Sequence, residues 1–82
     1  MKYYNNTFDL FILKDADSTE GEVVRGGLHP ANTGYKGFPI EKVLIGANFH
    51  TGTAEVTEAE AKSVLARCEK APAAPATKKR SR

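Results

Sequence analysis

The stretch TFDLFILK, residues 7–14, decides the fold. One face of the β-strand that it predicts carries apolar side chains at every second position, namely Phe8, Leu10 and Ile12. Phe11 and Leu13 make the opposite face apolar too, although a strand with one solvated face would be polar there. Either the rest of the chain covers both faces, or the second face contacts a partner. We favour coverage by the chain's own helix or loop.

The segments that follow predict short strands joined by turns. DADSTEGE, residues 15–22, has the small and acidic composition of a turn, and EVVR, residues 22–25, is expected to pair back onto the first strand. Residues 40–49 combine helical spacing with strand-forming residues and a glycine, so both assignments stay open. The favoured assignment is a strand over 42–49, a turn over 50–53 and a return strand over 54–56.

A glycine-rich loop, GGLHPANTGYKGFP, occupies residues 26–39 and has no apolar periodicity. Loops of this length are usually functional or disordered. Arg25, Thr33 and Lys36 are suitable side chains for holding an anion, but the spacing of a Walker loop or a dinucleotide fingerprint is missing. We therefore favour a connector or an interaction arm over a phosphate or nucleotide pocket.

Residues 57–70, TEAEAKSVLARCEK, predict an amphipathic helix that Pro72 stops. Thr57 and Glu60 have the spacing of a capping box, in which each side chain satisfies a backbone N–H near the helix start. Glu58 and Lys62 can form an i,i+4 ion pair. The apolar side chains recur at helical spacing along one stripe, at Ala61, Val64, Leu65 and Cys68.

Charge divides the chain into a mildly acidic body and a basic tail. Residues 1–70 have a net charge of −2, whereas residues 71–82 have a net charge of +4. The Ala/Pro-rich start of this tail predicts a disordered spacer. Its charged end is a candidate for weak, salt-sensitive contact with nucleic acid or with an acidic protein surface, through Lys78, Lys79, Arg80 and Arg82.

Size and composition argue against several other classes of protein. A single domain of about 70 residues buries only about 60% of its extended-chain surface, so association with other subunits is a natural source of stability. Cys68 is the one cysteine, and with His29 and His50 it makes a poor set of metal ligands. We expect no cofactor, no membrane segment and no secretory leader, and hence synthesis in a reducing cytoplasm.

Catalysis is not expected either. Cys68 with His29 or His50 could in principle supply a nucleophile and a base. Cys68, however, belongs to the apolar stripe of the predicted helix, where a buried thiol is usually inert. The two histidines are predicted to lie at the surface, in the glycine-rich loop and at a turn. We therefore predict a protein that is not an enzyme.

The C-terminal segment GTAEVTEAEAKSVLARCEKAPAAPATKKRSR resembles the C-terminal half of small proteins encoded among the head and tail genes of tailed bacteriophages. Those proteins often run from a short strand through V-T-x-x-x-A into a helix, and end in an Ala/Pro-rich, Lys/Arg-ended tail. Val56, Thr57 and Ala61 carry that pattern here. The resemblance implies a non-enzymatic virion subunit, and it transfers no functional residue to this chain.

These observations together predict an α+β fold: a small, mostly antiparallel sheet of short strands, one C-terminal amphipathic helix and a disordered basic tail. Residues 1–70 form the domain and residues 71–82 form the tail. The expected function is a minor capsid or decoration-type protein that binds other virion subunits in an oligomeric assembly, located in the virion or, before assembly, in the host cytoplasm. The candidate subunit interface comprises Phe11, Leu13, His29, Tyr35, Lys36 and Phe38.

Two other classes of function stay open. A small α/β protein with an acidic body also suits an intracellular phage effector that binds and inhibits a host enzyme or defence complex. The tail alone suits a nucleic-acid binder whose affinity falls steeply with salt.

Overall fold

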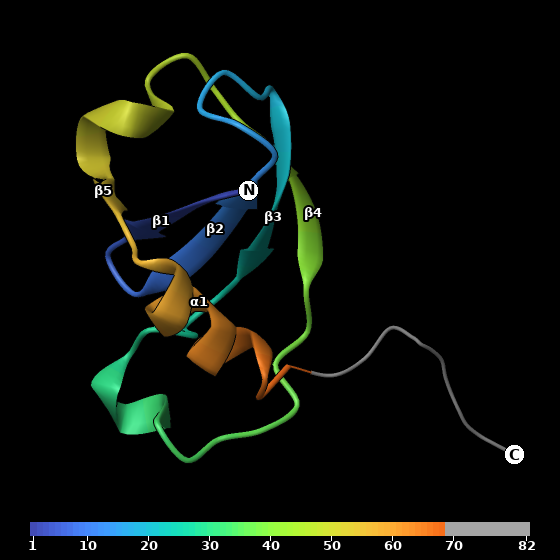
Figure 1. The fold of residues 1–82 in the computed structure, drawn as a ribbon, viewed down its shortest axis with the longest axis vertical. Coiled ribbons are helices and arrows are strands. Elements are labelled where there is room, and N and C mark those ends of the chain that lie inside the picture. The colour runs from blue at the N-terminus through green and yellow to red at the C-terminus, as the bar shows by residue number, and fades with distance from the viewer. Residues whose placement is uncertain (69–82) are drawn as a thin grey trace, which may run out of the picture.

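The computed structural model describes residues 1–68, which form one antiparallel sheet with an α-helix across it (Figure 1). The predictions for residues 69–82, including the basic tail, lie outside the described residues. The elements follow in the order β1 (Lys2–Asn6), β2 (Asp9–Leu13), β3 (Glu20–Val24), the 3-10 helix η1 (Pro30–Asn32), β4 (Glu41–Leu44), the 3-10 helix η2 (Phe49–Gly52), β5 (Ala54–Glu55) and α1 (Glu58–Leu65).

The sheet has five strands in the order β4-β3-β2-β1-β5, and every neighbouring pair is antiparallel. The predicted strand over residues 7–14 is therefore the central strand β2, and the predicted hairpin with the following segment is confirmed by β3. Tyr4 pairs with Phe11 across β1 and β2, and Phe11 pairs with Val23 across β2 and β3. This register puts the apolar residues of the three strands on common faces.

One face of the sheet packs against α1. Leu10 and Val24 are directly opposite each other on β2 and β3, and both are fully buried. The stripe of α1 covers them with Ala61 and Val64, which are also buried. Tyr3, Leu28, Leu65 and Cys68 border this core and are partly buried. The helical periodicity in the sequence thus predicted the packing face correctly.

The other face of the sheet is covered by the chain's own connection between β4 and β5. This connection passes from one edge strand to the other (Figure 1) and contains η2. The ring of Phe49 packs edge-on against Tyr4 and Phe11, with centroid separations of 5.6 and 5.0 Å. Leu13 on the same face has an exposed fraction of 0%. The strand is therefore apolar on both faces because both faces are inside the protein.

The helix begins as the sequence predicts and ends earlier. Thr57 is the N-cap, and its Oγ1 accepts a hydrogen bond from the backbone N–H of Glu60 at 3.2 Å. Glu58 and Lys62 form the expected ion pair at 3.2 Å. The prediction that the helix continues to residue 70 is wrong, because α1 ends at Leu65. Two turn residues follow, and Cys68 then forms an isolated parallel bridge with Phe38.

Two predictions about the strands are also wrong, and one strand was missed. β4 ends at Leu44, and the segment predicted to continue it to residue 49 turns away into η2. The return strand β5 pairs with β1, not with β4, because η2 carries the chain to the opposite edge of the sheet. The strand β1 itself was not predicted, since its sequence KYYNN ends in two asparagines, which are rare in strands.

Candidate functional site

The side chain of Arg67 organises the glycine-rich loop. Its guanidinium donates hydrogen bonds to three backbone carbonyl groups of the loop, those of Gly27, Asn32 and Tyr35. It also lies over the ring of Phe38, 5.4 Å from the centroid, and the backbone carbonyl of Arg67 accepts from the N–H of Gly37 at 2.7 Å. The planar, five-donor guanidinium suits this role because it can contact several acceptors at once.

The beginning of the loop is packed tightly against the core. A Cβ on Gly27 would lie 2.8 Å from Val24 Cγ1 and 2.8 Å from Val64 Cγ1, so only glycine fits between β3 and α1. Gly26 has a positive φ of 72° and donates its N–H to Asp9 Oδ1 at 2.7 Å. The loop predicted as a connector or an arm is therefore attached to the domain at both ends.

The six residues of the predicted interface do not form one surface. Leu13 and Phe38 are buried in the protein's own core, with exposed fractions of 0% and 4%, so their assignment to an interface is wrong. Phe11 is half-buried beneath Phe49. The physical reason is that β2 is a central strand and that Phe38 packs beneath Arg67 at the end of α1.

The other three predicted interface residues lie in the glycine-rich loop. His29 is half-buried, its Nδ1 accepts a hydrogen bond from the N–H of Ala31 at 3.0 Å, and its ring packs on Phe8 at 4.3 Å. Tyr35 is 52% exposed and packs edge-on against Phe38, whereas Lys36 is exposed. Tyr35 and Lys36 are therefore the members of the set that a neighbouring molecule can reach.

The two arginines near the loop already have partners. Arg25 lies 4.0 Å from Asp9 and 3.5 Å from Glu41 in two ion pairs, and Arg67 is occupied by the loop carbonyls. An anion in the loop would have to compete with these contacts. The geometry gives no support to the phosphate-binding alternative, because the two arginines are used to hold the fold.

Cys68 and the two histidines are engaged separately. The Cys68 thiol donates to the carbonyl of Val64 at 3.5 Å. Burial raises the pKa of this thiol above its ordinary value, while the Arg67 guanidinium acts in the opposite direction. His50 Nε2 lies 2.8 Å from the carbonyl of Ala16, and its ring packs on Tyr4. Within residues 1–68, no three His, Cys, Asp or Glu side chains are grouped so that they could hold a metal ion.

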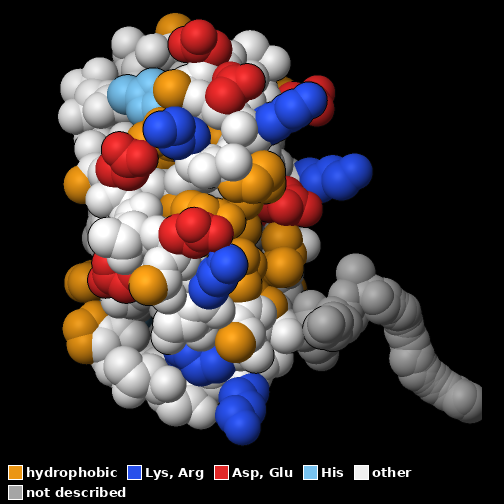
Figure 2. All heavy atoms as spheres, viewed as in Figure 1, with side chains coloured by type: hydrophobic (Ala, Val, Ile, Leu, Met, Phe, Trp, Pro, Cys, Tyr) orange, Lys and Arg blue, Asp and Glu red, His pale blue; other side chains and the backbone are white. Residues whose placement is uncertain are grey.

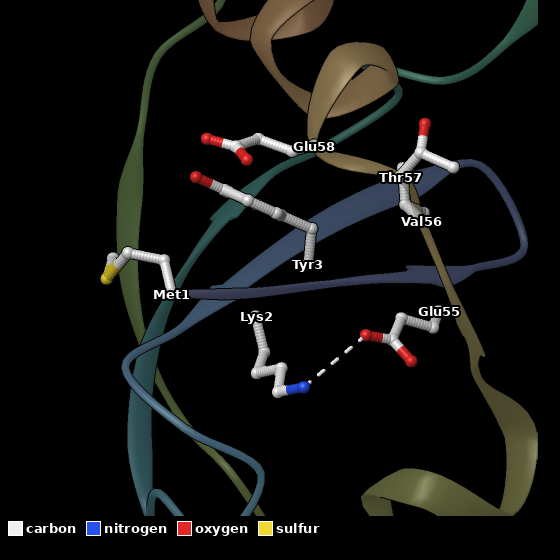
Figure 3. A pocket seen from close by; sticks show the side chains of 7 residues that line it. All are labelled: Met1, Lys2, Tyr3, Glu55, Val56, Thr57 and Glu58. Atoms are coloured by element: carbon white, nitrogen blue, oxygen red, sulfur yellow. Dashed lines mark ion pairs between the residues drawn. The ribbon is translucent and has the colours of Figure 1, made fainter.

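A hollow of about 530 Å³ lies where β1 and β5 meet the start of α1 (Figure 3). Lys2 and Glu55 form an ion pair of 3.7 Å on one side of it, and the side chain of Tyr3 extends toward Glu58 on the other. Glu58 is itself paired with Lys62. Each charged side chain that lines this hollow thus already has a partner of opposite charge, which makes the hollow a weak candidate for binding a charged ligand.

The most distinctive exposed feature is the edge strand β4. Leu44 on this strand is 82% exposed, and Met1 beside it is 71% exposed. Both line a shallow hollow of about 460 Å³ on the α1 side of the sheet, with Ile12 and Val43. Figure 2 shows apolar side chains running through the middle of this face, with acidic and basic side chains around them.

The outer side of β4 has a defined pattern of backbone groups. The N–H of Ile45 donates to the carbonyl of Thr19 at 2.8 Å, which places these two residues in a hydrogen-bonded pair. Such pairs alternate along an antiparallel ladder, so Val43 and Glu41 also direct their N–H and C=O groups toward β3. Lys42 and Leu44 direct theirs away from the sheet. Among residues 1–68, no strand pairs with this outer side.

Sequence reasoning missed this edge. Residues 42–44 of β4 were predicted as part of a strand, but the position of this strand at the edge of the sheet depends on strand order, which the sequence pattern did not reveal. The available signal was Lys42, because a lysine at an edge strand is a common device against uncontrolled pairing. We name this feature, comprising β4 with Met1, the β4 edge.

In the part of the chain that the structure describes, no helix has the length and apolar character needed to span a membrane. Comparison with known proteins adds no assignment: no family model matches the chain, and no match was found among curated proteins or among solved structures.

Proposed function

We propose that this protein is a non-enzymatic structural subunit that binds neighbouring subunits of a larger assembly through the β4 edge. One observation carries the proposal: Leu44 is 82% exposed on an edge strand whose outer backbone groups are unpaired within residues 1–68. An exposed edge of this kind is a ready template for pairing with another chain. Binding by added strands obtains affinity from backbone hydrogen bonds and selectivity from the side-chain pockets next to them.

The position of the edge supports this function. β4 and β5 are the two edge strands of the sheet, and α1 directly follows β5 in the chain. β4 is therefore the edge strand away from the start of α1. The hollow beside it is lined in part by the apolar side chains of Ile12, Met1 and Leu44, of which Met1 and Leu44 are largely exposed. A neighbouring chain that covers these side chains would remove apolar surface from water, which stabilises the complex by roughly 25 cal/mol for each Å² buried.

The more specific proposal is a phage virion protein of the minor capsid or decoration type. It rests on the resemblance of residues 52–82 to small proteins of phage head and tail gene clusters. The fold is in keeping with it, since a short sheet with one eight-residue helix has a small core and gains stability from neighbours. The contacts of the loop and of Cys68 suit a structural role equally well, because they hold the fold together.

The experiment is quantitative mass spectrometry of purified particles that were assembled while this chain was present. We expect the chain at a fixed number of copies per particle. Leu44→Lys should lower that number strongly, because it places a charge at the centre of the proposed contact. Tyr35→Lys is the matched control: it changes another exposed, apolar side chain in the same way, in the glycine-rich loop and not on β4, and should leave the copy number unchanged. Absence of the chain from the particles would overturn the proposal.

A further inference from the structure

We propose that the β4 edge binds a second copy of this chain, so that the β4 strands of two molecules pair antiparallel and form one continuous ten-stranded sheet. The inference rests on the proposed function and names the partner at that surface. Three features support it: the direction of the backbone groups of β4, the charges next to the strand and the exposed side chain of Leu44.

The backbone pattern allows a two-fold symmetric pairing. Lys42 and Leu44 direct both their N–H and C=O groups outward, as the hydrogen bond of Ile45 to Thr19 implies. If Lys42 of one copy lies opposite Leu44 of the other, these two residues can exchange both bonds. Symmetry repeats the pair on the other side of the axis, and all the paired residues lie within β4. Val43 then faces Val43 of the second copy at the axis.

The charges next to β4 favour this partner. Glu22 pairs with Lys42, and Glu20 pairs with Leu44, across β3 and β4. Lys14, Lys42, Glu20 and Glu22 line the same hollow and sum to zero charge. Two copies of a neutral surface do not repel each other, whereas a strongly charged partner would gain nothing from it.

The side chains of the proposed pair also complement each other. In this register Lys42 of the second copy lies next to Leu44 on the same face of the sheet, so that its methylene chain can cover the exposed leucine while its ammonium group reaches Glu20. A shift of the register by two residues in one direction would put Lys42 opposite Lys42, and like charges directly opposite each other are destabilising. A shift in the other direction would bring Gly46, outside β4, into the ladder.

The experiment is a site-specific disulfide cross-link between purified chains, in a Cys68→Ser background so that only the engineered thiols react. Val43→Cys should form a covalent dimer of twice 8.9 kDa under oxidised glutathione, because residues that face each other at a non-hydrogen-bonded pair have Cα atoms about 4.5 Å apart, within the range for a disulfide. Lys42→Cys is the matched control on the adjacent residue. It should cross-link far less to itself, and should form dimers when mixed with Leu44→Cys chains.

Two further variants distinguish the outcomes. Adding Leu44→Lys to Val43→Cys should abolish most of the cross-link, and adding Tyr35→Lys should leave it unchanged, with circular dichroism confirming that both remain folded. Equal cross-linking of Val43→Cys and Lys42→Cys, or no dimer from Val43→Cys, would overturn the symmetric pairing. The cross-linking experiment uses the chain alone, so its failure would contradict the symmetric dimer and leave the proposed binding to other subunits untouched. Absence of the chain from purified particles would contradict the proposed function and leave the dimer untouched.

Discussion

The guanidinium of Arg67 lies over the ring of Phe38, with 5.4 Å between its central carbon and the ring centroid, and the same side chain binds three carbonyl groups of the glycine-rich loop. One residue just past the end of α1 therefore fixes a loop whose bound carbonyl groups lie 32 to 40 positions away in the chain. This contact explains why a long segment with little regular structure has a defined course over the end of the sheet.

Arg67→Met should lower the free energy of unfolding by about 1–3 kcal/mol, because the loop carbonyls lose their donor while the aliphatic packing on Phe38 is largely kept. The measurement is urea unfolding followed by circular dichroism. Arg25→Met is the control: its ion pairs with Asp9 and Glu41 are largely exposed, so the loss should be about 0–1 kcal/mol. Equal losses for the two variants would contradict the role of Arg67.

Gly27→Ala should destabilise the fold by about 1–3 kcal/mol, because the added methyl group would lie 2.8 Å from both Val24 Cγ1 and Val64 Cγ1. Gly34→Ala is the matched control in the same loop, since nothing lies within 4 Å of a Cβ at that position. It should be neutral or stabilising by up to about 1 kcal/mol. Thermal unfolding of the two variants side by side tests the packing, and a stable Gly27→Ala variant would show that β3 and α1 are further apart.

Phe49→Ala tests whether the chain itself covers the second face of the sheet. The substitution removes the ring that packs on Tyr4 and Phe11, and we expect a loss of about 2–4 kcal/mol in the free energy of unfolding. Phe8→Ala removes a phenylalanine that is more exposed and should cost less. If Phe49→Ala had no effect in the isolated chain, the face would have to be covered by another molecule.

The thiol of Cys68 provides a test by pH. Burial raises its pKa in the folded protein, so the thiolate forms at a higher pH than it does in the unfolded chain. The midpoint of the pH dependence of iodoacetamide alkylation should therefore be higher in buffer than in urea. The contribution of the neutral Cys68 thiol to the free energy of unfolding is fully present below the ordinary thiol pKa. It is lost as the pH rises through the raised pKa of the folded protein. Cys68→Ser should lack this dependence, and a lower midpoint in the folded protein would contradict the burial.

The sequence was most informative where a short pattern determines the packing. Apolar residues on both faces of residues 7–14 predicted a strand between two covering layers, and α1 and η2 are those layers. The stripe of Ala61 and Val64 and the cap at Thr57 were predicted for the same reason, since both depend on spacing within a few residues.

The sequence was least informative where strand pairing or burial depends on contacts between residues that are far apart in the chain. The two-residue strand β5 is too short to carry a pattern, so its pairing with β1 could not be predicted. Phe38 is apolar and lies in a loop, which suggests an exposed contact, but in the structure Arg67 and Cys68 lie beside it. The β4 edge was missed because exposure of Leu44 follows from strand order and not from the residue type.

Amide hydrogen exchange at Lys42 and Leu44 tests the central claim most directly, because assembly through the β4 edge must change the environment of these two N–H groups. In the dilute chain both should exchange much faster than the amide of Val43, which lies in the β3–β4 ladder. In assembled particles, or in the concentrated dimer, both should become protected, while Gly34 should not change. Rapid exchange of Lys42 and Leu44 in the assembled state would contradict the account.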